Sequence, residues 1–281
     1  MRKVISITAA AIAVLAASAP ALAATGPPAG PKPTVKVSGL SLARVTLPRT
    51  HLPHLTPHAL VTSSNWSGYA AVAKKNVRLR YVAVTFTIPS VNCKKSTLGS
   101  QGVAYASNWV GLDGFNSGTV EQTGVDSYCD STRTAQYDAW YEMYPLAPVV
   151  FSGVNPGDAI SVSVYLNGSK YNLSLADLTT GAKLQTSQPC PRHSTCRDSS
   201  AEVITEDPGN AEPAIDLADF GLVNFTAGAV TSADGTRGTF TGNSLWTSSE
   251  IVMKDSHRKL MAQPSSLEGG KAFNIAWKAA Q

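Results

Sequence analysis

The chain has 281 residues, of which 43% are hydrophobic and 15% are charged, and its formal net charge is +4 at pH 7. Residues 1–61 hold six of the 23 Lys and Arg residues and no Asp or Glu, so residues 62–281 carry 17 bases against 19 acids. The main part of the chain therefore lacks the basic excess that nucleic-acid binding requires, and we expect no nucleic-acid partner.

Residues 1–24 have the pattern of a secretory signal. Arg2 and Lys3 precede an apolar run, and Ala21 and Ala23 provide a small-residue cleavage site. No later stretch is long and apolar enough to span a bilayer. We therefore expect a secreted, extracellular protein with no membrane segment.

Residues 25–61 are rich in Pro and Gly and carry cations at Lys32, Lys36, Arg44 and Arg49. This composition predicts a basic pro-segment or linker. In one interpretation it is a solvated linker. In the other, its cations lie against an acidic cleft and leave when the carboxylates become protonated.

Residues 62–281 are expected to form one all-β domain. Short alternating or β-branched runs are separated by turn sequences such as Asn167-Gly168 and Asp234-Gly235, and no helical period of useful length appears. The runs cover residues 68–72, 80–88, 103–112, 120–126, 137–144, 159–166, 170–177, 201–205, 220–226, 238–241, 245–253 and 273–277. This pattern predicts a two-sheet antiparallel β-sandwich of the lectin-like or jelly-roll kind, with a barrel as the alternative closure.

Four cysteines, Cys93, Cys129, Cys190 and Cys196, suit an oxidising compartment and can pair in three ways. We expect Cys93–Cys129 and Cys190–Cys196, because the second pair closes a short segment that already has the sequence of a turn. A zinc site at Cys190, His193 and Cys196 is the competing interpretation, but a fourth ligand is missing. We expect no metal.

Two neighbouring runs place polar side chains on one strand face each, because side chains alternate with period two. The first run presents Gln122, Gly124 and Asp126 together, and the second presents Asp138, Trp140, Glu142 and Tyr144. Burying such carboxylates without partners costs several kcal/mol, so these faces are expected to line a wet groove.

The remaining residues exclude several hydrolytic mechanisms. Residues 62–281 contain only two histidines, His193 and His257, and no Gly-x-Ser-x-Gly motif, no unpaired cysteine and no Asp-Thr/Ser-Gly pair. The candidates that remain are carboxylates and an amide in strand contexts: Glu142, Glu202, Glu206 and Gln122.

Five blocks follow one another in order: SNWSG at 64–68, WVGLDG at 109–114, QTGVD at 122–126, YDAWYEMYP at 137–145 and AEVITED at 201–207. Together they resemble the glutamic peptidase family, also called eqolisins. The resemblance implies a secreted endopeptidase with a two-sheet β-sandwich that cleaves protein or peptide substrates in acid. We expect it to act as a monomer without a cofactor.

The resemblance also implies roles for individual residues. It places the catalytic pair at Gln122 and Glu206 and gives supporting positions in the substrate cleft to Trp66, Trp109, Asp113, Asp138 and Glu142. Chemistry agrees with this pair, because an ionised glutamate can take a proton from an attacking water and an amide can donate to the oxyanion. We expect the two tryptophans to shape the cleft and Asp138 to brace Gln122 or a neighbouring strand.

Two other functions fit a β-sandwich with groove carboxylates. A glycoside hydrolase would use Glu142 and Glu206 as its acid pair, and it would have no need of Gln122. A lectin-like module would bind carbohydrate without catalysis, and the substitution Glu206→Gln would hardly change its function.

Overall fold

The computed structural model describes residues 34–43, 52–53, 55–57, 59–209 and 215–280, all of which belong to one compact unit, Pro33–Gln281. The expected signal, residues 1–24, lies outside the described residues. Within the described ranges no helix is long and apolar enough to cross a membrane.

The described residues form strands and no helices, which confirms the all-β prediction. The strands are β1 Thr34–Ser38, β2 Ser41–Leu42, β3 Leu60–Ser63, β4 Trp66–Ala73, β5 Leu79–Thr87, β6 Ala104–Leu112, β7 Val120–Cys129, β8 Ala135–Tyr144, β9 Val149–Ser152, β10 Ala159–Asn167, β11 Lys170–Asp177, β12 Lys183–Pro189, β13 Ser200–Glu206, β14 Asp216–Leu217, β15 Leu222–Ser232, β16 Arg237–Gly238, β17 Trp246–Lys254, β18 Leu260–Pro264 and β19 Phe273–Trp277.

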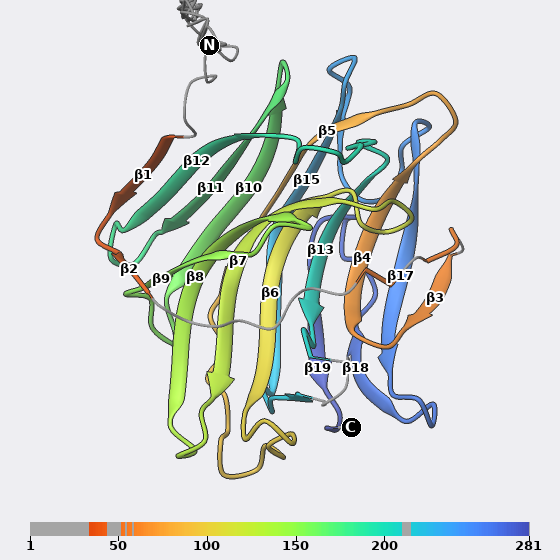
Figure 1. The fold of residues 1–281 in the computed structure, drawn as a ribbon. Coiled ribbons are helices and arrows are strands. Elements are labelled where there is room, and N and C mark those ends of the chain that lie inside the picture. The colour runs from red at the N-terminus through yellow and green to blue at the C-terminus, as the bar shows by residue number, and fades with distance from the viewer. Residues whose placement is uncertain (1–33, 44–51, 54, 58, 210–214, 281) are drawn as a thin grey trace, which may run out of the picture. The chain divides into compact units, whose positions relative to one another are not determined.

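The strands build two layers that are joined along one side (Figure 1). One layer, which we call the site sheet, has the order β17-β4-β13-β6-β7-β8-β9. The other, the second sheet, has the order β12-β11-β10-β5-β15-β19. Strand β18 pairs with both β17 and β19 and so connects the layers. This confirms the two-sheet antiparallel β-sandwich.

The main hydrophobic core lies between the sheets. Strand β5 of the second sheet contributes Val82, Val84 and Phe86, while Val110 and Val125 enter from β6 and β7 of the site sheet. All five side chains are at most 2% exposed. Full burial of such a side chain contributes roughly 1.5–3 kcal/mol, so this core fixes which face of each strand turns inward.

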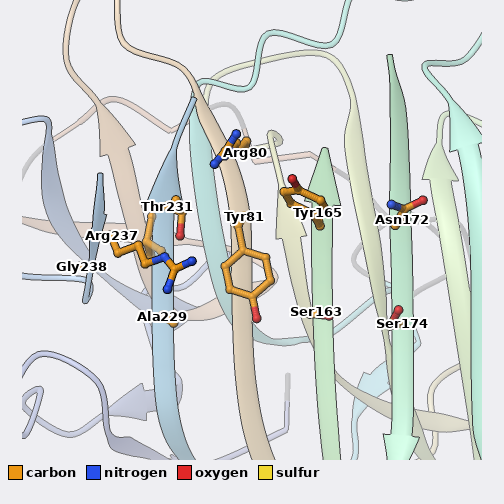
Figure 2. A pocket seen from close by; sticks show the side chains of 11 residues that line it. Arg80, Tyr81, Ser163, Tyr165, Asn172, Ser174, Ala229, Thr231, Arg237 and Gly238 are labelled. Carbon is orange, nitrogen blue, oxygen red and sulfur yellow. The ribbon is translucent and has the colours of Figure 1, made fainter. Parts of the chain in front are cut away.

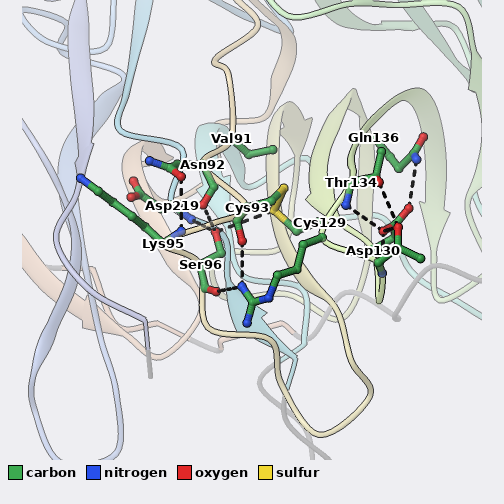
Figure 3. Close-up of a disulfide and its surroundings, with 12 residues drawn as sticks. Val91, Asn92, Cys93, Lys95, Ser96, Cys129, Asp130, Thr134, Gln136 and Asp219 are labelled. Atoms are coloured by element: carbon green, nitrogen blue, oxygen red, sulfur yellow. Dashed lines mark hydrogen bonds between the residues drawn. A yellow bond between two sulfur atoms is a disulfide. The ribbon is translucent and has the colours of Figure 1, made fainter.

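Two disulfides fasten the loops, and they are the two pairs expected from the sequence. Cys93–Cys129 ties the segment after β5 to the end of β7 (Figure 3). Beside it, Arg133 Nη1 donates to the carbonyl oxygens of Cys93 and Ser96 at 2.8 and 3.0 Å. Cys190–Cys196 closes the loop between β12 and β13, and this overturns the zinc interpretation because both sulfur atoms are bonded to each other.

Some of the described residues between 25 and 61 belong to strands. Strand β1 pairs antiparallel with β12, and β2 pairs antiparallel with β9, so each covers an outer strand of one sheet. The boundary drawn after residue 61 falls inside β3, which pairs in parallel with β17. Lys36 lies on β1 beside Gln185 and lines a pocket there. Lys32, Arg44 and Arg49 lie outside the described residues.

Candidate active site

Strand alternation gathers the polar residues of the site sheet on its outer face. On β4, β7, β8 and β13, even-numbered side chains such as Trp66, Trp140 and Ile204 form a hydrophobic cluster on this face, whereas odd-numbered neighbours enter the main core. On β6 the parity is reversed, with Trp109 in the outer cluster and Val110 in the main core. Gln122, Glu142 and Glu206 also have even numbers on β7, β8 and β13. They therefore share the outer face, a relation between strands that the structure supplies and alternation within one strand does not.

Gln122 and Glu142 are direct neighbours across β7 and β8. They lie opposite each other in the register, and Gln122 Nε2 donates a hydrogen bond to Glu142 Oε2 at 2.6 Å. Gln122 is fully buried and Glu142 is 2% exposed. A short bond of this kind between an amide and a carboxylate holds the plane of the amide in one orientation.

Glu206 stands at the last position of β13 and receives two hydrogen bonds from side chains. Trp109 Nε1 donates to its Oε2 at 2.9 Å, and Asn65 Nδ2 donates to its Oε1 at 3.2 Å. The orientation of Asn65 is set in turn by Ser63, whose hydroxyl donates to Asn65 Oδ1 at 3.1 Å. Each carboxylate oxygen of Glu206 thus has a defined donor.

Burial dominates the electrostatics of Glu206. The side chain is 1% exposed, and desolvation together with the charge of Glu142 raises its pKa well above the usual value. The indole groups of Trp66 and Trp109 act in the opposite direction. The charge of Glu142, the hydrogen-bond partner of Gln122, thus acts on Glu206.

Aromatic and aliphatic side chains surround the polar groups of the site, and some of them come from the segment before β3. Trp66 and Trp109 make an edge-to-face contact with ring centres 5.0 Å apart. Leu55 belongs to the same cluster, and its backbone N–H donates to Phe115 O at 2.6 Å. Ala43 and Leu52, which are partly buried, pack against this cluster. The expectation of a wet groove is wrong for this form of the chain, because these residues help to bury the site.

Asp138 braces a neighbouring strand. Tyr128 Oη on β7 donates to its Oδ2 at 3.1 Å, and its partner in the register is Asp126. Burial and the nearby charges of Asp138 and Glu142 raise the pKa of Asp126 to about 7, although the Ser107 hydroxyl donates to it. Desolvation also raises the pKa of Asp138.

Asp113 holds a loop. It follows β6 with a left-handed φ of 68°, and its carboxylate accepts the backbone N–H groups of Arg197, Asp198 and Ser199 at 2.6–2.8 Å. These three residues lead into β13. Asp113 therefore fixes the start of the strand whose other end carries Glu206.

Glu202 shares the strand face of Glu206 but lies in different surroundings. It is fully buried, and its pKa is raised well above the usual value by desolvation and by the charges of Asp113 and Glu121. No hydrogen-bond donor among the described residues reaches its carboxylate oxygens. Burial, with the charge of Asp113, likewise raises the pKa of Glu121.

Sequence reasoning missed two contributors to the site. Asn65 belongs to the SNWSG block, but it precedes the first residue of β4, so strand alternation gives no direction for its side chain. Leu55 lies in the segment expected to act through its cations, and only its burial in the structure reveals an apolar contact. No group of residues in the described part of the chain could hold a metal ion.

The site therefore combines a buried carboxylate with two fixed donors and an amide held by a second carboxylate. Such groups can move a proton and stabilise an oxyanion. Two stacked antiparallel sheets with a glutamate and a glutamine on one outer face are the arrangement expected of a glutamic peptidase.

Comparison with known proteins agrees with this class. The sequence pattern of the Peptidase A4 family matches residues 64–275, and the chain belongs to that family of peptide-bond hydrolases. It is 34% identical to aspergillopepsin-2 of Aspergillus niger over 195 residues, which cover 63% of this chain and 67% of that protein. It is also 34% identical to scytalidopepsin B of Scytalidium lignicola over 148 residues, 51% of this chain and 52% of that relative, so this match spans about half the relative's length.

Solved structures of glutamic peptidases share the fold. Scytalido-glutamic peptidase with a peptide-based transition state analog superposes with a TM-score of 0.61 at 27% identity, covering 76% of this chain and 98% of that one. Aspergilloglutamic peptidase from Aspergillus niger gives a TM-score of 0.53 at 28% identity, covering 62% and 99%. The family expected from the five sequence blocks is thereby confirmed.

Proposed function

We propose that this chain is a secreted, acid-acting glutamic endopeptidase in which Glu206 activates water and Gln122 stabilises the tetrahedral intermediate. The position of both side chains on the outer face of the site sheet, each held by its own hydrogen bonds, is the observation that supports this best. Related solved structures hold a peptide-based transition state analog in one case and the tripeptide Ala-Ile-His in another. Peptides are accordingly the proposed substrates.

Glu206 acts as the general base in this proposal. In its ionised form it takes a proton from the water that attacks the peptide carbonyl carbon, and it then returns this proton to the departing amine nitrogen. Donation from Trp109 and Asn65 stabilises the ionised form and fixes the direction of the carboxylate. The proton thus passes from the water to Glu206 and from Glu206 to the amine, which leaves Glu206 ionised again at the end of the reaction.

Gln122 donates to the oxygen of the former carbonyl as negative charge develops on it. An amide carries two hydrogens on its nitrogen and keeps both at every pH. The bond to Glu142 uses one of them and so sets the direction of the other. Glu142 is thus a positioning residue in this mechanism.

The proposed action in acid depends on how burial and hydrogen bonding together set the pKa of Glu206. Burial is the largest cause of its raised pKa, and access of water to the site would remove much of that cause. The pKa of Glu206 would then fall toward the ordinary range of a glutamate, and more of the base would be ionised in mild acid. Asp126 and Asp207 have pKa values of about 7 and about 8, chiefly through burial, so both stay neutral in that range.

The segment before β3 is proposed to be an inhibitory pro-segment. Ala43, Leu52 and Leu55 pack against the cluster that contains Trp66 and Trp109, so substrate and this segment compete for one surface. Pairing of β3 with β17 favours a processing point before Leu60, since a later cut would divide a strand of the sheet. A secretory signal at residues 1–24 and two disulfides support export.

The test is digestion of a denatured protein at about pH 4 in the presence of an aspartic-peptidase inhibitor, since Glu is partly ionised there. We expect wild-type enzyme to cleave and Glu206→Gln to lose activity. Glu202→Gln is the matched control, because it changes a buried glutamate on the same strand face outside the proposed mechanism. Equal activity of Glu206→Gln and wild type would refute the proposal.

A further inference from the structure

A pocket of about 630 Å³ lies on the second sheet and is lined by side chains from β5, β10, β11 and β15 (Figure 2). Its residues Tyr81 and Ser163 alternate with Val82 and Val162, which enter the main core, so the pocket is on the outer face of this sheet. One register row crosses it from strand to strand: Arg237, Thr231, Tyr81, Tyr165, Asn172 and Ser187 are successive partners on β16, β15, β5, β10, β11 and β12. At a strand spacing of about 4.8 Å, this row is roughly 24 Å long.

A second row runs parallel to the first and continues the hollow. Ser163, Ser174 and Gln185 are partners on β10, β11 and β12, and Lys36 on β1 pairs with Gln185. Asn172 and Ser174 line both the pocket and a neighbouring one of about 350 Å³ that Lys36 borders. The two pockets therefore form one polar groove that runs across the strands.

Aromatic rings and guanidinium groups occupy one end of this groove. Tyr81 and Tyr165 meet edge to face at 6.2 Å, and the Arg80 guanidinium carbon lies 5.8 Å from the centre of the Tyr165 ring. Arg80 Nε is buried and has no hydrogen-bond acceptor among the described residues. Arg237 points toward Tyr81 from the other side (Figure 2).

In the full chain, which still carries β1, charge in the groove is positive at both ends, at Arg80 and Arg237 and at Lys36, and absent from its floor. No acid is among the described residues that line the two pockets. Asp234 interacts electrostatically with Arg80, but its carboxylate already accepts hydrogen bonds from the Ser232 hydroxyl and the Thr236 N–H. The guanidinium groups of Arg80 and Arg237 are therefore available to bind an external anion.

We propose that this groove binds an acidic polysaccharide in which uronic acids are spaced by neutral sugars. Tyrosine rings offer apolar faces to sugar rings, Ser, Asn and Gln side chains pair with hydroxyls, and arginine binds carboxylates in bidentate fashion. Because the cations lie only at the two ends of the groove, they match a polysaccharide whose carboxylates are few and far apart. A peptide is disfavoured, because β15, β5, β10 and β11 lie inside the sheet and their backbone groups already pair with neighbouring strands.

The test is affinity electrophoresis of the full chain carrying Glu206→Gln, which prevents self-digestion under the proposed function without touching the groove. Glucuronoxylan in the gel is expected to retard the protein, and neutral arabinoxylan to retard it at least tenfold less. Arg237→Ala and Tyr165→Ala should each weaken retardation roughly tenfold, as loss of a charged hydrogen bond or of a stacking ring implies. Lys254→Ala on β17 removes the same charge elsewhere and should leave retardation unchanged.

Three outcomes would overturn the proposal. The first is no retardation by glucuronoxylan, and the second is equal or stronger retardation by poly-glutamate, which would indicate an acidic peptide or a general anion effect. The third is an equal loss of retardation in Lys254→Ala and Arg237→Ala, which would show that binding depends on the net charge of the protein and not on the groove. Casein cleavage by Tyr165→Ala in the otherwise wild-type chain should equal that of the parent, so failure here stays separate from failure of the peptidase assignment.

Discussion

The buried aspartate Asp126 makes a quantitative prediction about stability against pH. Burial raises its folded-state pKa from 3.8 to about 7. Between these values the folded chain holds a proton that the unfolded chain has released, so stability is greatest below about pH 3.8 and falls as pH rises to about 7. A difference of roughly three units corresponds to about 4 kcal/mol lost across this interval.

Asp126→Asn should remove this loss. Asparagine is neutral at every pH and keeps a carbonyl oxygen to accept the Ser107 hydroxyl. We expect the variant to match its parent near pH 4 and to exceed it by up to about 4 kcal/mol near pH 7.5, measured by urea unfolding. Both proteins should carry Glu206→Gln so that self-digestion does not distort the curves.

Asp130 provides a control of opposite sign. It is exposed, and hydrogen bonds from Thr132 and Thr134 lower its pKa to about 2, so it stabilises the fold above the unfolded-state pKa and loses this effect as pH falls. Asp130→Asn should therefore destabilise the chain at neutral pH and not at pH 2. The reasoning is refuted if Asp126→Asn and its parent show the same difference in stability at pH 4 and pH 7.5.

Three further changes test the site. Trp109→Phe removes a donor that stabilises ionised Glu206, so the pKa of Glu206 should rise and the acid limb of kcat/KM should move to higher pH; an unchanged limb would show that this donor does not act on the base. Glu142→Gln removes a charge that raises this pKa, so the limb should move to lower pH while kcat falls; an unmoved limb contradicts the coupling. Leu55→Ala in the precursor should weaken the cover by about 2 kcal/mol and raise its activity before processing roughly 30-fold; unchanged precursor activity argues against a cover.

Strand faces around the site could be predicted because one face of each strand packs into a core. Alternation grouped Gln122 with Asp126 in β7 and Glu142 with Asp138 in β8, and the register shows that these two faces coincide. Short or polar strands could not be predicted in this way. β12 (Lys183–Pro189) contains Lys, Gln and Ser, and β9 (Val149–Ser152) has four residues, so both depend on pairing with neighbours more than on their own composition.

The packing of Ala43, Leu52 and Leu55 against the site could not be predicted from the sequence for a similar reason. Residues 25–61 have the composition of a linker, and the alternation in β1 (Thr34–Ser38) is short. β1 and β2 form strands because the outer edges of β12 and β9 are open for pairing, and these edges exist only once the sheets have assembled. The hydrogen bond from Asn65 to Glu206 joins residues 141 positions apart, and no local pattern predicts such a contact.

The most direct measurement of the central claim is kcat/KM for processed enzyme with Glu206→Gln, Gln122→Ala and both together, on one peptide in acid. Loss of an oxyanion donor typically costs about 2.7–4 kcal/mol, so Gln122→Ala should be about 100- to 1000-fold slower while remaining folded. Because the two groups act on one intermediate, the double variant should be no slower than Glu206→Gln alone. A Gln122→Ala enzyme within threefold of wild type, or losses that multiply fully in the double variant, would contradict a shared role.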